Sequence, residues 1–275
     1  MYILGLNAFH GDSSACLLKD GVVIAAAEEE RFRRIKHWAG FPSEAIKWCL
    51  SDAGISLESV DHIAINQDPK ANLGKKIIYT IKNPPKLNML LGRFLNRIER
   101  GSVKDHLKNE FPKSSYNGEI HPVEHHTAHL FSAFHVSPFN KAAVISVDGF
   151  GDFASTAWGA GDGVNIDIDD KVYFPHSLGI YYMALTQFIG FYNWGDEYKV
   201  MGLAPYGKPI YLDEMRQIVK LMPNGKFELN LDYFCHHKEK IEYVWKNDSP
   251  SVKPLFTNKL ENLLGPVRKR GEDLT

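Results

Sequence analysis

Two parts of the sequence, separated by 148 − 7 = 141 positions, follow the same pattern of residues. In the first part, the apolar run 2–6 leads into a polar turn that begins at Asn7. In the second, the apolar run 142–147 leads into a glycine-rich acidic turn that begins at Asp148. Each turn is followed by a Ser- and Ala-rich run and then by an Asp-Gly pair, which favours a tight hairpin. A repeat at fixed spacing indicates an internal duplication, and it constrains the fold more than any other feature.

The first copy continues with short elements of clear type. Apolar runs predict strands at 2–6, 13–18, 22–27 and 61–66. A helix is predicted to begin near Pro42 and to stop before Gly54, and its apolar face consists of Ala45, Ile46, Trp48, Cys49 and Leu50. Three strands, a helix and a further strand are the order of a ribonuclease-H-like unit. Two such units make an α/β fold of the actin/hexokinase-like kind, in which the two hairpin turns hold nucleotide phosphates, and we expect this fold.

With 275 residues, the chain is long enough for two subdomains with cores of their own. We expect a first ribonuclease-H-like subdomain at 1–141, with a basic helical insertion at 68–116, and a second at 142–275. Segment 68–113 holds eleven Lys or Arg against four Asp or Glu. Apolar residues recur there at helical spacing, at Leu87, Leu91, Phe94, Leu95 and Ile98. We favour a solvated insertion packed on the main body over a partner surface.

The second copy is predicted to be shorter than the first. Helices are expected at 177–191 and 211–222, and a strand or loop at 227–234. No closing element is predicted after 255, so we expect the second ribonuclease-H-like unit to be incomplete.

A pair of histidines at helical spacing predicts a metal site. Pro122 favours a helix start, and the four-residue spacing of His125 and His129 puts both imidazoles on one face of that helix. Asp148, at the end of an apolar strand, can supply a third ligand, and two His with one carboxylate are typical of a catalytic metal centre. An ordinary pair of half-buried histidines is the alternative. A metalloprotease helix lacks support, because His126 stands where the general base of H-E-x-x-H would be.

Composition restricts the class of protein. The net charge of −1 gives no general attraction to nucleic acid or to a membrane. The three cysteines show no metal-binding or redox spacing, so we expect reduced thiols and a cytoplasmic location. The apolar run near Met1 is too short for a signal peptide, and no apolar run is long enough to span a bilayer.

Together these residues resemble the NodU/CmcH carbamoyltransferase family. The similar stretches, in chain order, are 3–7 with 12–15, 28–37 with 41–42, 125–129, 148–152 and 197–207. The family is related to the universal tRNA threonylcarbamoyladenosine synthesis proteins, which share the His-x-x-x-His pair.

The resemblance implies an activity and a division of labour. Members transfer a carbamoyl group from carbamoyl phosphate to a hydroxyl of a small molecule and consume ATP. A C-terminal YrdC-like domain makes carbamoyl-adenylate, and the N-terminal actin-like domain binds it together with a divalent metal. By position, His125, His129 and Asp148 would hold that metal, with iron the first choice and manganese, zinc and magnesium open. A fourth ligand and the YrdC-like domain would lie past Thr275, so we expect the N-terminal part of a carbamoyltransferase, inactive alone.

The resemblance also suggests catalytic and donor-binding residues. His10 or Asp12, on the first turn, is the candidate for the general base or for acceptor binding, although His10 could equally cap its own turn. Arg31, Lys36 and His37 form a basic cluster that could bind the anionic donor. Without the family match this cluster would be an ordinary exposed charged segment.

Two further parts of the sequence can contact phosphate. Backbone N–H groups at Gly149 and Gly151 can approach a phosphate because no Cβ intervenes. Lys199 offers a cation within a loop rich in glycine, although such loops are more often only connections.

Other functions remain open at this point. The chain could be a truncated, non-catalytic module that binds nucleotide and metal, a relative of the tRNA threonylcarbamoyl transferases, or, least favoured, an actin-like sugar kinase. The acceptor could be an aminoglycoside, a cephem, a nodulation oligosaccharide or another secondary metabolite. Nucleic acid and membrane partners are not expected, and a homodimer is left open.

Overall fold

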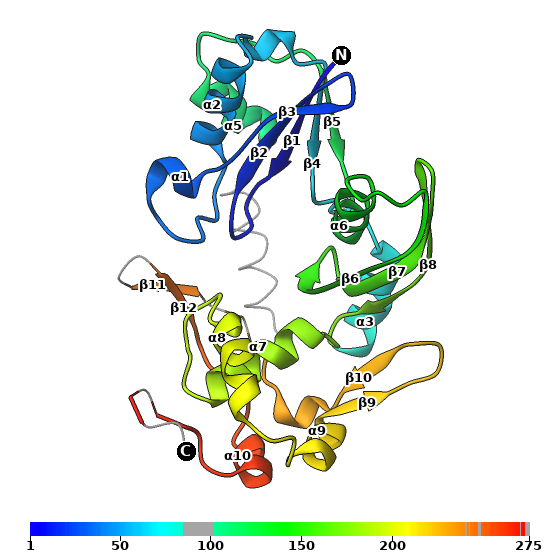
Figure 1. Cartoon of the computed structure of the whole chain (residues 1–275), viewed down its shortest axis with the longest axis vertical. Helices are drawn as coiled ribbons and strands as arrows, with labels where there is room; N and C mark the ends of the chain where they lie inside the picture. Colours follow the sequence, from blue (N-terminus) through cyan, green and yellow to red (C-terminus); the bar gives the residue numbers. More distant parts are fainter. Residues whose placement is uncertain (85–101, 240, 242, 247–248, 270, 273–275) are drawn as a thin grey trace. The chain divides into compact units, whose positions relative to one another are not determined.

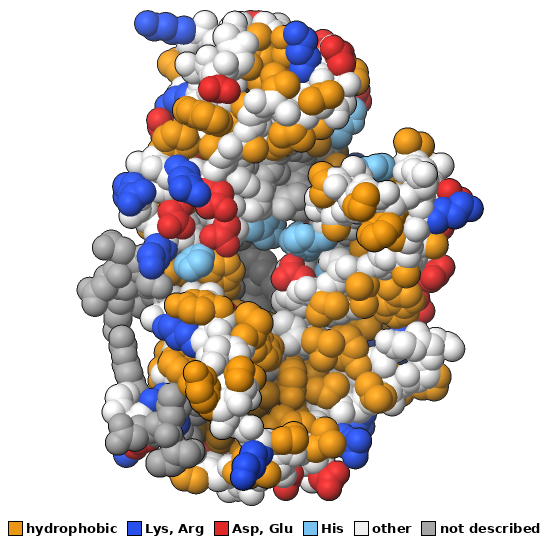
Figure 2. All heavy atoms as spheres, in the orientation of Figure 1, with side chains coloured by type: hydrophobic (Ala, Val, Ile, Leu, Met, Phe, Trp, Pro, Cys, Tyr) orange, Lys and Arg blue, Asp and Glu red, His pale blue; other side chains and the backbone are white. Residues whose placement is uncertain are grey.

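The computed structural model describes residues 1–84, 102–239, 241, 243–246, 249–269 and 271–272 (Figure 1). Contacts divide the chain into two compact units, Met1–His125 and His126–Thr275. The sequence predicts a division between 141 and 142 instead, and the two divisions differ in the helix and loop at 126–141. Charged side chains of both signs are interspersed over the face shown in Figure 2, in keeping with the net charge of −1.

A mixed five-stranded sheet, in the order β3-β2-β1-β4-β5, is the centre of the first unit (Figure 1). The first three strands are antiparallel neighbours, whereas β4 and β5 run parallel to β1. The strands are β1 (Tyr2–Asn7), β2 (Ser14–Lys19), β3 (Val22–Glu28), β4 (His62–Ile65) and β5 (Glu119–Pro122). This order is that of a ribonuclease-H-like unit, so the predicted fold class and the four predicted strands are confirmed.

The edge strand β5 corrects one prediction. Pro122 was expected to start the helix that carries the histidine pair, but it ends β5 and pairs with Ile65 of β4. The pairing continues as the backbone N–H of Val123 donates to Ile65 O at 2.8 Å, and the helix begins only at His125. Proline is tolerated on an edge strand because its missing N–H can face away from the sheet.

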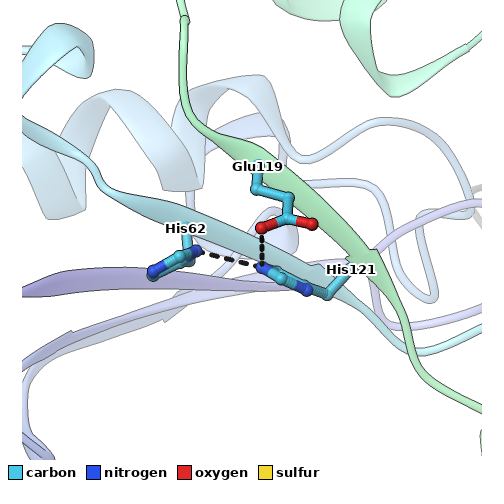
Figure 3. Close-up of side chains that lie close together, drawn as sticks. All are labelled: His62, Glu119 and His121. Atoms are coloured by element: carbon cyan, nitrogen blue, oxygen red, sulfur yellow. Dashed lines mark hydrogen bonds and ion pairs between the residues drawn. The ribbon is translucent and has the colours of Figure 1, made fainter.

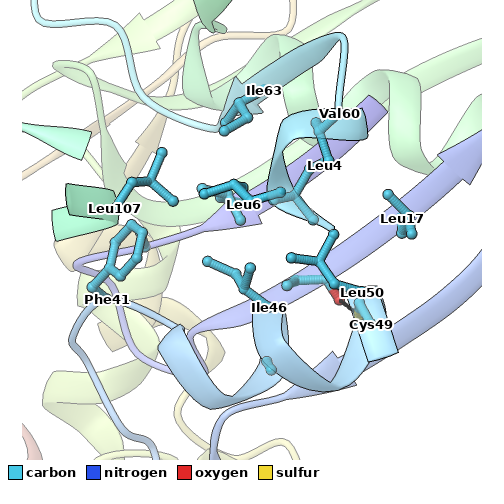
Figure 4. Packing of buried hydrophobic residues seen from close by; sticks show 14 of the residues in the cluster. Leu4, Leu6, Leu17, Phe41, Ile46, Cys49, Leu50, Val60, Ile63 and Leu107 are labelled. Atoms are coloured by element: carbon cyan, nitrogen blue, oxygen red, sulfur yellow. Dashed lines mark hydrogen bonds between the residues drawn. The ribbon is translucent and has the colours of Figure 1, made fainter. Parts of the chain in front are cut away.

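The core of the first unit lies between this sheet and α2 (Ser43–Asp52), as Figure 4 shows. Leu4 and Ile63 are fully buried on two neighbouring strands, and Ile46 of the helix is fully buried against the sheet. Trp48, which was predicted on the apolar face, is 39% exposed. It lies at the margin of the buried stripe, where a large ring is only partly covered.

A buried carboxylate holds the N-terminus of α2. Glu29 is fully buried, and its oxygens accept hydrogen bonds from the backbone N–H of Glu44 at 3.2 Å and of Ala45 at 2.8 Å. Arg33 adds an ion pair, Nε to Oε1, at 2.6 Å. Pro42 at the N-cap provides no side-chain acceptor. Glu29 therefore satisfies N–H groups that the helix start leaves without partners, and its charge is favourable there.

The helical insertion between β4 and β5 is described only in part. Its described helices are α3 (Leu73–Lys82) and α5 (Val103–Glu110), and α1 (Glu30–Arg33) and the 3₁₀ turn η1 (Leu57–Ser59) precede it. A capping box of Ser102 and Asp105 begins α5, whereas α3 buries none of its residues. The helix predicted from Leu87 to Ile98 lies outside the described residues.

The second unit begins with a helix on an antiparallel sheet of order β6-β7-β8. These elements are α6 (His125–Phe134), β6 (Lys141–Gly151), β7 (Ala154–Asp162) and β8 (Asn165–Tyr173). Leu130 and Phe134 of α6 pack against Val144 and Ala157 of the sheet, and this packing groups the helix with the second unit.

Strand register supports the internal duplication. In the first hairpin, Leu6 pairs with Ala15, and in the second hairpin, Val147 pairs with Thr156. The separation is 141 positions on both strands, because 147 − 6 = 141 and 156 − 15 = 141. The two hairpins therefore share one register. Within the described residues, the second sheet has three strands where the first has five.

The remainder of the second unit is built from short elements. These are α7 (Leu178–Phe188), α8 (Glu197–Leu203), η2 (Ala204–Tyr206), α9 (Leu212–Ile218), β9 (Val219–Leu221), β10 (Phe227–Leu229), η3 (Leu231–Tyr233), β11 (Tyr243–Lys246), β12 (Ser249–Val252) and α10 (Lys259–Leu264). The helix predicted at 211–222 ends at Ile218, because the next residues pair with β10. A helix, α10, also lies in the region where no closing element was predicted. No helix within the described ranges combines the length and the apolar character needed to cross a lipid bilayer.

A buried histidine makes the stability of the second unit sensitive to pH. His236 is 4% exposed, and its Nε2 donates to Pro175 O at 2.8 Å. Burial lowers the pKa of His236 from its ordinary value of 6.5 to about 4. Unfolding therefore takes up a proton between these two pH values, and the stabilisation present above pH 6.5 is lost as the pH falls towards 4.

We predict that the substitution His236→Gln flattens this pH dependence, because the amide keeps an N–H donor and does not titrate. Between pH 7 and pH 4.5, wild type should lose roughly 2 kcal/mol more free energy of unfolding than the variant. Urea denaturation followed by circular dichroism at both pH values measures the difference. Equal losses in the two proteins would contradict the assignment.

Candidate metal centre

The predicted metal ligands come together. His125 and His129 are carried by the continuous helix α6, and Asp148 lies on β6. One ligand atom from each residue lies within 4.8 Å of the others, and His129 Nε2 is 3.6 Å from Asp148 Oδ2. Metal–ligand distances of about 2.0–2.2 Å place ligand atoms roughly 3–3.5 Å apart, so small side-chain movements bring these atoms onto one ion. The residues therefore fit a single divalent cation.

Exposure differs among the three candidate ligands. His125 is buried, with 6% exposure, whereas the side chains of His129 and Asp148 are 49% and 40% exposed. One ligand is thus fixed by packing, and the other two leave a side open to solvent. Three protein ligands with an open side suit a catalytic rather than a structural metal.

The histidine between the two ligands anchors the helix. His126 is fully buried, and its Nδ1 lies 2.9 Å from Ser146 Oγ on β6. This hydrogen bond joins α6 to the strand that carries Asp148. From the sequence alone, His126 is only a residue that stands where a catalytic glutamate would be, and this anchoring role is not predicted. The position of Ser146 on the buried face of its strand, two residues before Asp148, was the available signal.

The turn at Asp148 is held by the start of α7. Ser177 caps this helix by accepting from the backbone N–H of Ile180 at 3.0 Å, and its Oγ donates to Asp148 O at 2.9 Å. Gly179 allows a close approach, because a Cβ there would lie 2.6 Å from the backbone N of Gly149. The helix start at 177 was predicted, but its contact with the acidic turn was not.

The two glycines of the acidic turn have different surroundings. The N–H of Gly149 donates to Asp148 Oδ1 at 2.6 Å, and a Cβ at Gly149 would meet nothing within 4 Å. Gly151 is buried at the end of β6, where it pairs with Ala154. Contact of these N–H groups with a phosphate stays a prediction.

The structure pairs a residue of the first turn, Asp12, with His37, and separate roles were predicted for the two. His37 Nδ1 lies 2.9 Å from Asp12 Oδ1. Both residues have left-handed backbones, with φ of 60° at Asp12 and 56° at His37, a conformation that is uncommon for residues other than glycine. An ionised carboxylate can only accept, so Nδ1 of His37 carries the donated proton. The ring of His10 lies 5.5 Å from that of His125, between centroids.

The predicted basic residues differ in their surroundings. Arg31 and Lys36 are exposed. Lys199, on α8, forms an ion pair with the buried carboxylate of Asp196 at 2.6 Å, and its Nζ lies 5.5 Å from the centroid of the Phe191 ring. Its cation is therefore already balanced in this structure. Binding of an anionic donor by these residues stays a prediction.

Comparisons with known proteins agree on a family. The family model described as "Carbamoyltransferase N-terminus" matches residues 2–248. An uncharacterized protein of Synechocystis, sll1178, is 39% identical over 241 residues, which cover 85% of this chain and 39% of that protein. The nodulation protein NolNO of Sinorhizobium fredii is 36% identical over 229 residues, which cover 82% of this chain and 32% of that protein. The chain thus spans about a third to two fifths of the length of these relatives.

A solved structure adds little to this. The structure of YeaZ from Pseudomonas aeruginosa aligns with 63% of this chain and 66% of its own, at 15% identity and a TM-score of 0.35. That score is too low to support an argument.

The close approach of α7 to the acidic turn gives a test of this geometry. We predict that Gly179→Ala lowers the free energy of unfolding by about 1–3 kcal/mol, because its Cβ would overlap backbone atoms that cannot yield easily. Urea denaturation measures this loss. The matched control is Gly202→Ala on α8, where a Cβ meets nothing within 4 Å and a change of about 1 kcal/mol in the stabilising direction is expected. Equal effects of the two substitutions would show that the turn is not packed as described.

Proposed function

The chain belongs to the carbamoyltransferase N-terminal family, and we propose that it provides the carbamoyl-transfer site of an O-carbamoyltransferase. In this proposal it binds carbamoyl-adenylate and a divalent metal and transfers the carbamoyl group to a hydroxyl of a small-molecule acceptor. The observation that supports it most directly is the convergence of His125, His129 and Asp148 within 4.8 Å, on the motifs that resemble the family.

The proposed reaction requires the protein to perform three catalytic tasks. The acceptor hydroxyl oxygen attacks the carbamoyl carbon, the bond from that carbon to the phosphate oxygen breaks, and AMP departs with the bond's electron pair. The hydroxyl proton passes to a base. The site must therefore align the two reactants, accept one proton and balance the negative charge on the departing phosphate.

The metal-binding residues are proposed to stabilise the negative charge on the departing phosphate through the ion they hold. A divalent ion held by His125, His129 and Asp148 would act as a Lewis acid towards phosphate oxygens. Imidazole ligands favour a transition metal, with iron the first choice and manganese, zinc and magnesium still open. The anchoring of α6 through His126, and of the acidic turn through Ser177, keeps the ligand positions fixed as reactants enter and leave.

For the base, we propose the pair of Asp12 and His37. The carboxylate fixes the imidazole ring and its tautomer through Nδ1, an arrangement that suits His37 to accept a proton at Nε2. His10 is the other candidate, and its ring lies beside that of the metal-ligand candidate His125. Arg31 and Lys36 are proposed to attract the anionic donor, and Lys199 would have to exchange Asp196 for phosphate to contribute.

A reconstitution assay tests the transfer role. The chain is mixed with a separately expressed YrdC-like domain, ATP and radiolabelled carbamoyl phosphate, and the acceptors are an aminoglycoside, a cephem and a chitin oligosaccharide. We expect labelled acceptor only when both proteins are present. Transfer by the chain unaided would overturn the proposed division of labour, and a persistent lack of transfer with ATP and metal still bound would favour a non-catalytic binding module.

We predict that His129→Gln reduces transfer at least about 100-fold, because the charge on the departing phosphate loses its stabilisation. Folding should be unaffected, since this side chain is 49% exposed. The control is His135→Gln, the same change at an exposed histidine just past the end of α6. Undiminished transfer by His129→Gln would remove this centre from the reaction.

The choice of base gives a further prediction. His37→Asn should lower kcat by about 10²–10⁴-fold with little change in KM for the acceptor, as expected for a lost proton acceptor. Asp12→Asn should act in the same direction, because the ring loses its orienting carboxylate. Steady-state kinetics of His10→Asn provide the comparison, and a large loss confined to that variant would assign the base to His10 instead.

A further inference from the structure

A second cluster of metal-ligating side chains lies within the first unit, on the sheet edge formed by β4 and β5. It consists of His62 from β4 and of Glu119 and His121 from β5 (Figure 3). None of the sequence motifs that resemble the family includes these residues. They do not overlap with the ligands of the proposed transfer centre, and the inference does not depend on the proposed function.

Strand pairing places the three side chains on one face. His62 is the register partner of Glu119, and register partners in a parallel pair point to the same side. His121 is two residues further along β5 and points to that side as well. Ile63 and Ile65, which alternate with His62, are buried in the core, so the cluster faces away from α2.

The distances suit a single small cation. His62 Nδ1 lies 3.0 Å from His121 Nε2, and that nitrogen lies 3.8 Å from Glu119 Oε2. Around a tetrahedral ion with bonds of about 2.0–2.2 Å, ligand atoms lie about 3.4 Å apart. Each distance therefore needs a change of only a few tenths of an ångström. The side chains of His121 and Glu119 are 42% and 73% exposed, so such adjustments meet little resistance.

We propose that His62, Glu119 and His121 bind a divalent transition-metal cation, with zinc the best match. Two imidazole nitrogens and one carboxylate oxygen form a ligand set that zinc commonly takes, and water would complete the coordination. Without the ion, one imidazole N–H is shared between the two rings. On binding, that proton moves to the outer nitrogen of the same ring through solvent exchange, so both facing nitrogens become ligands and each ring stays neutral.

The bound ion would join two strands by their side chains. β5 has four residues, and β4 is its only neighbour in the sheet as the structure describes it. A cation that bridges His62 to Glu119 and His121 would add a link beside the backbone hydrogen bonds. It would thereby slow the opening of this edge, which leads directly into the helix that carries His125.

Metal counting in a background that lacks the other centre tests the proposal. The full chain carrying His129→Gln is freed of metal with a chelator, dialysed against Zn²⁺ and measured by elemental analysis. We expect one zinc per chain, lost on addition of His121→Gln or His62→Gln and retained on addition of His135→Gln. Glu119→Gln should weaken binding at least about tenfold. Circular dichroism confirms folding, and if the histidine variants unfold, the highly exposed Glu119→Gln carries the test.

Hydrogen exchange provides an independent readout. Zinc should slow exchange of the backbone N–H of Val123, which donates to Ile65, by at least about threefold, and should not do so in His121→Gln. The proposal is overturned if the zinc count is the same with and without His62→Gln and His121→Gln, or if binding is weaker than about 1 mM. Loss of transfer activity in His129→Gln bears on the other centre alone, so the two proposals can fail separately.

Discussion

The buried hydrogen bond between His126 and Ser146 is the contact on which the candidate transfer centre depends. It connects the helix that carries two of the ligands to the strand that carries the third. Both groups are buried, so breaking this hydrogen bond leaves desolvated polar groups and costs about 1–3 kcal/mol. Leu130 packed on Val144 adds apolar contact at the same junction. The distances between the candidate ligand atoms are therefore set by how α6 packs on β6, and not by contacts among the three side chains themselves.

Much of the fold could be predicted because strands and tight turns are determined largely by residues that are neighbours in the sequence. Apolar runs identified four strands of the first sheet, and the Asp-Gly turn identified the hairpin between the second and the third. The predictions failed where long-range pairing decides the structure. The edge strand Glu119–Pro122 is short, polar and ends in proline, and the helix beyond Tyr211 ends at Ile218 only because the following residues pair with β10. Neither partner can be identified from the segment alone.

The same distinction applies to the candidate site. Helical periodicity predicts that His125 and His129 share one face of a helix, and the apolar run before Asp148 predicts that it ends a strand. The convergence of the three side chains could therefore be predicted from the sequence. The pairing of Asp12 with His37 could not be foreseen, because the two residues are 37 − 12 = 25 positions apart, with β2, β3 and α1 between them. The acidic residue Glu29 belonged to a motif, but its burial against the start of α2 required the structure.

The shared register of the two hairpins means that Asn7 and Asp148 occupy equivalent corners of the repeat. Their chemistry has diverged: the amide of Asn7 donates to Gly11 O and Asp12 O and accepts from Asn66, so it is fully engaged in bracing its own loop. The carboxylate at the other corner carries a charge that a cation can use. The two copies of the repeat therefore differ in chemistry at equivalent positions: hydrogen bonds hold the amide in one copy, whereas the other copy presents an acidic side chain that is 40% exposed.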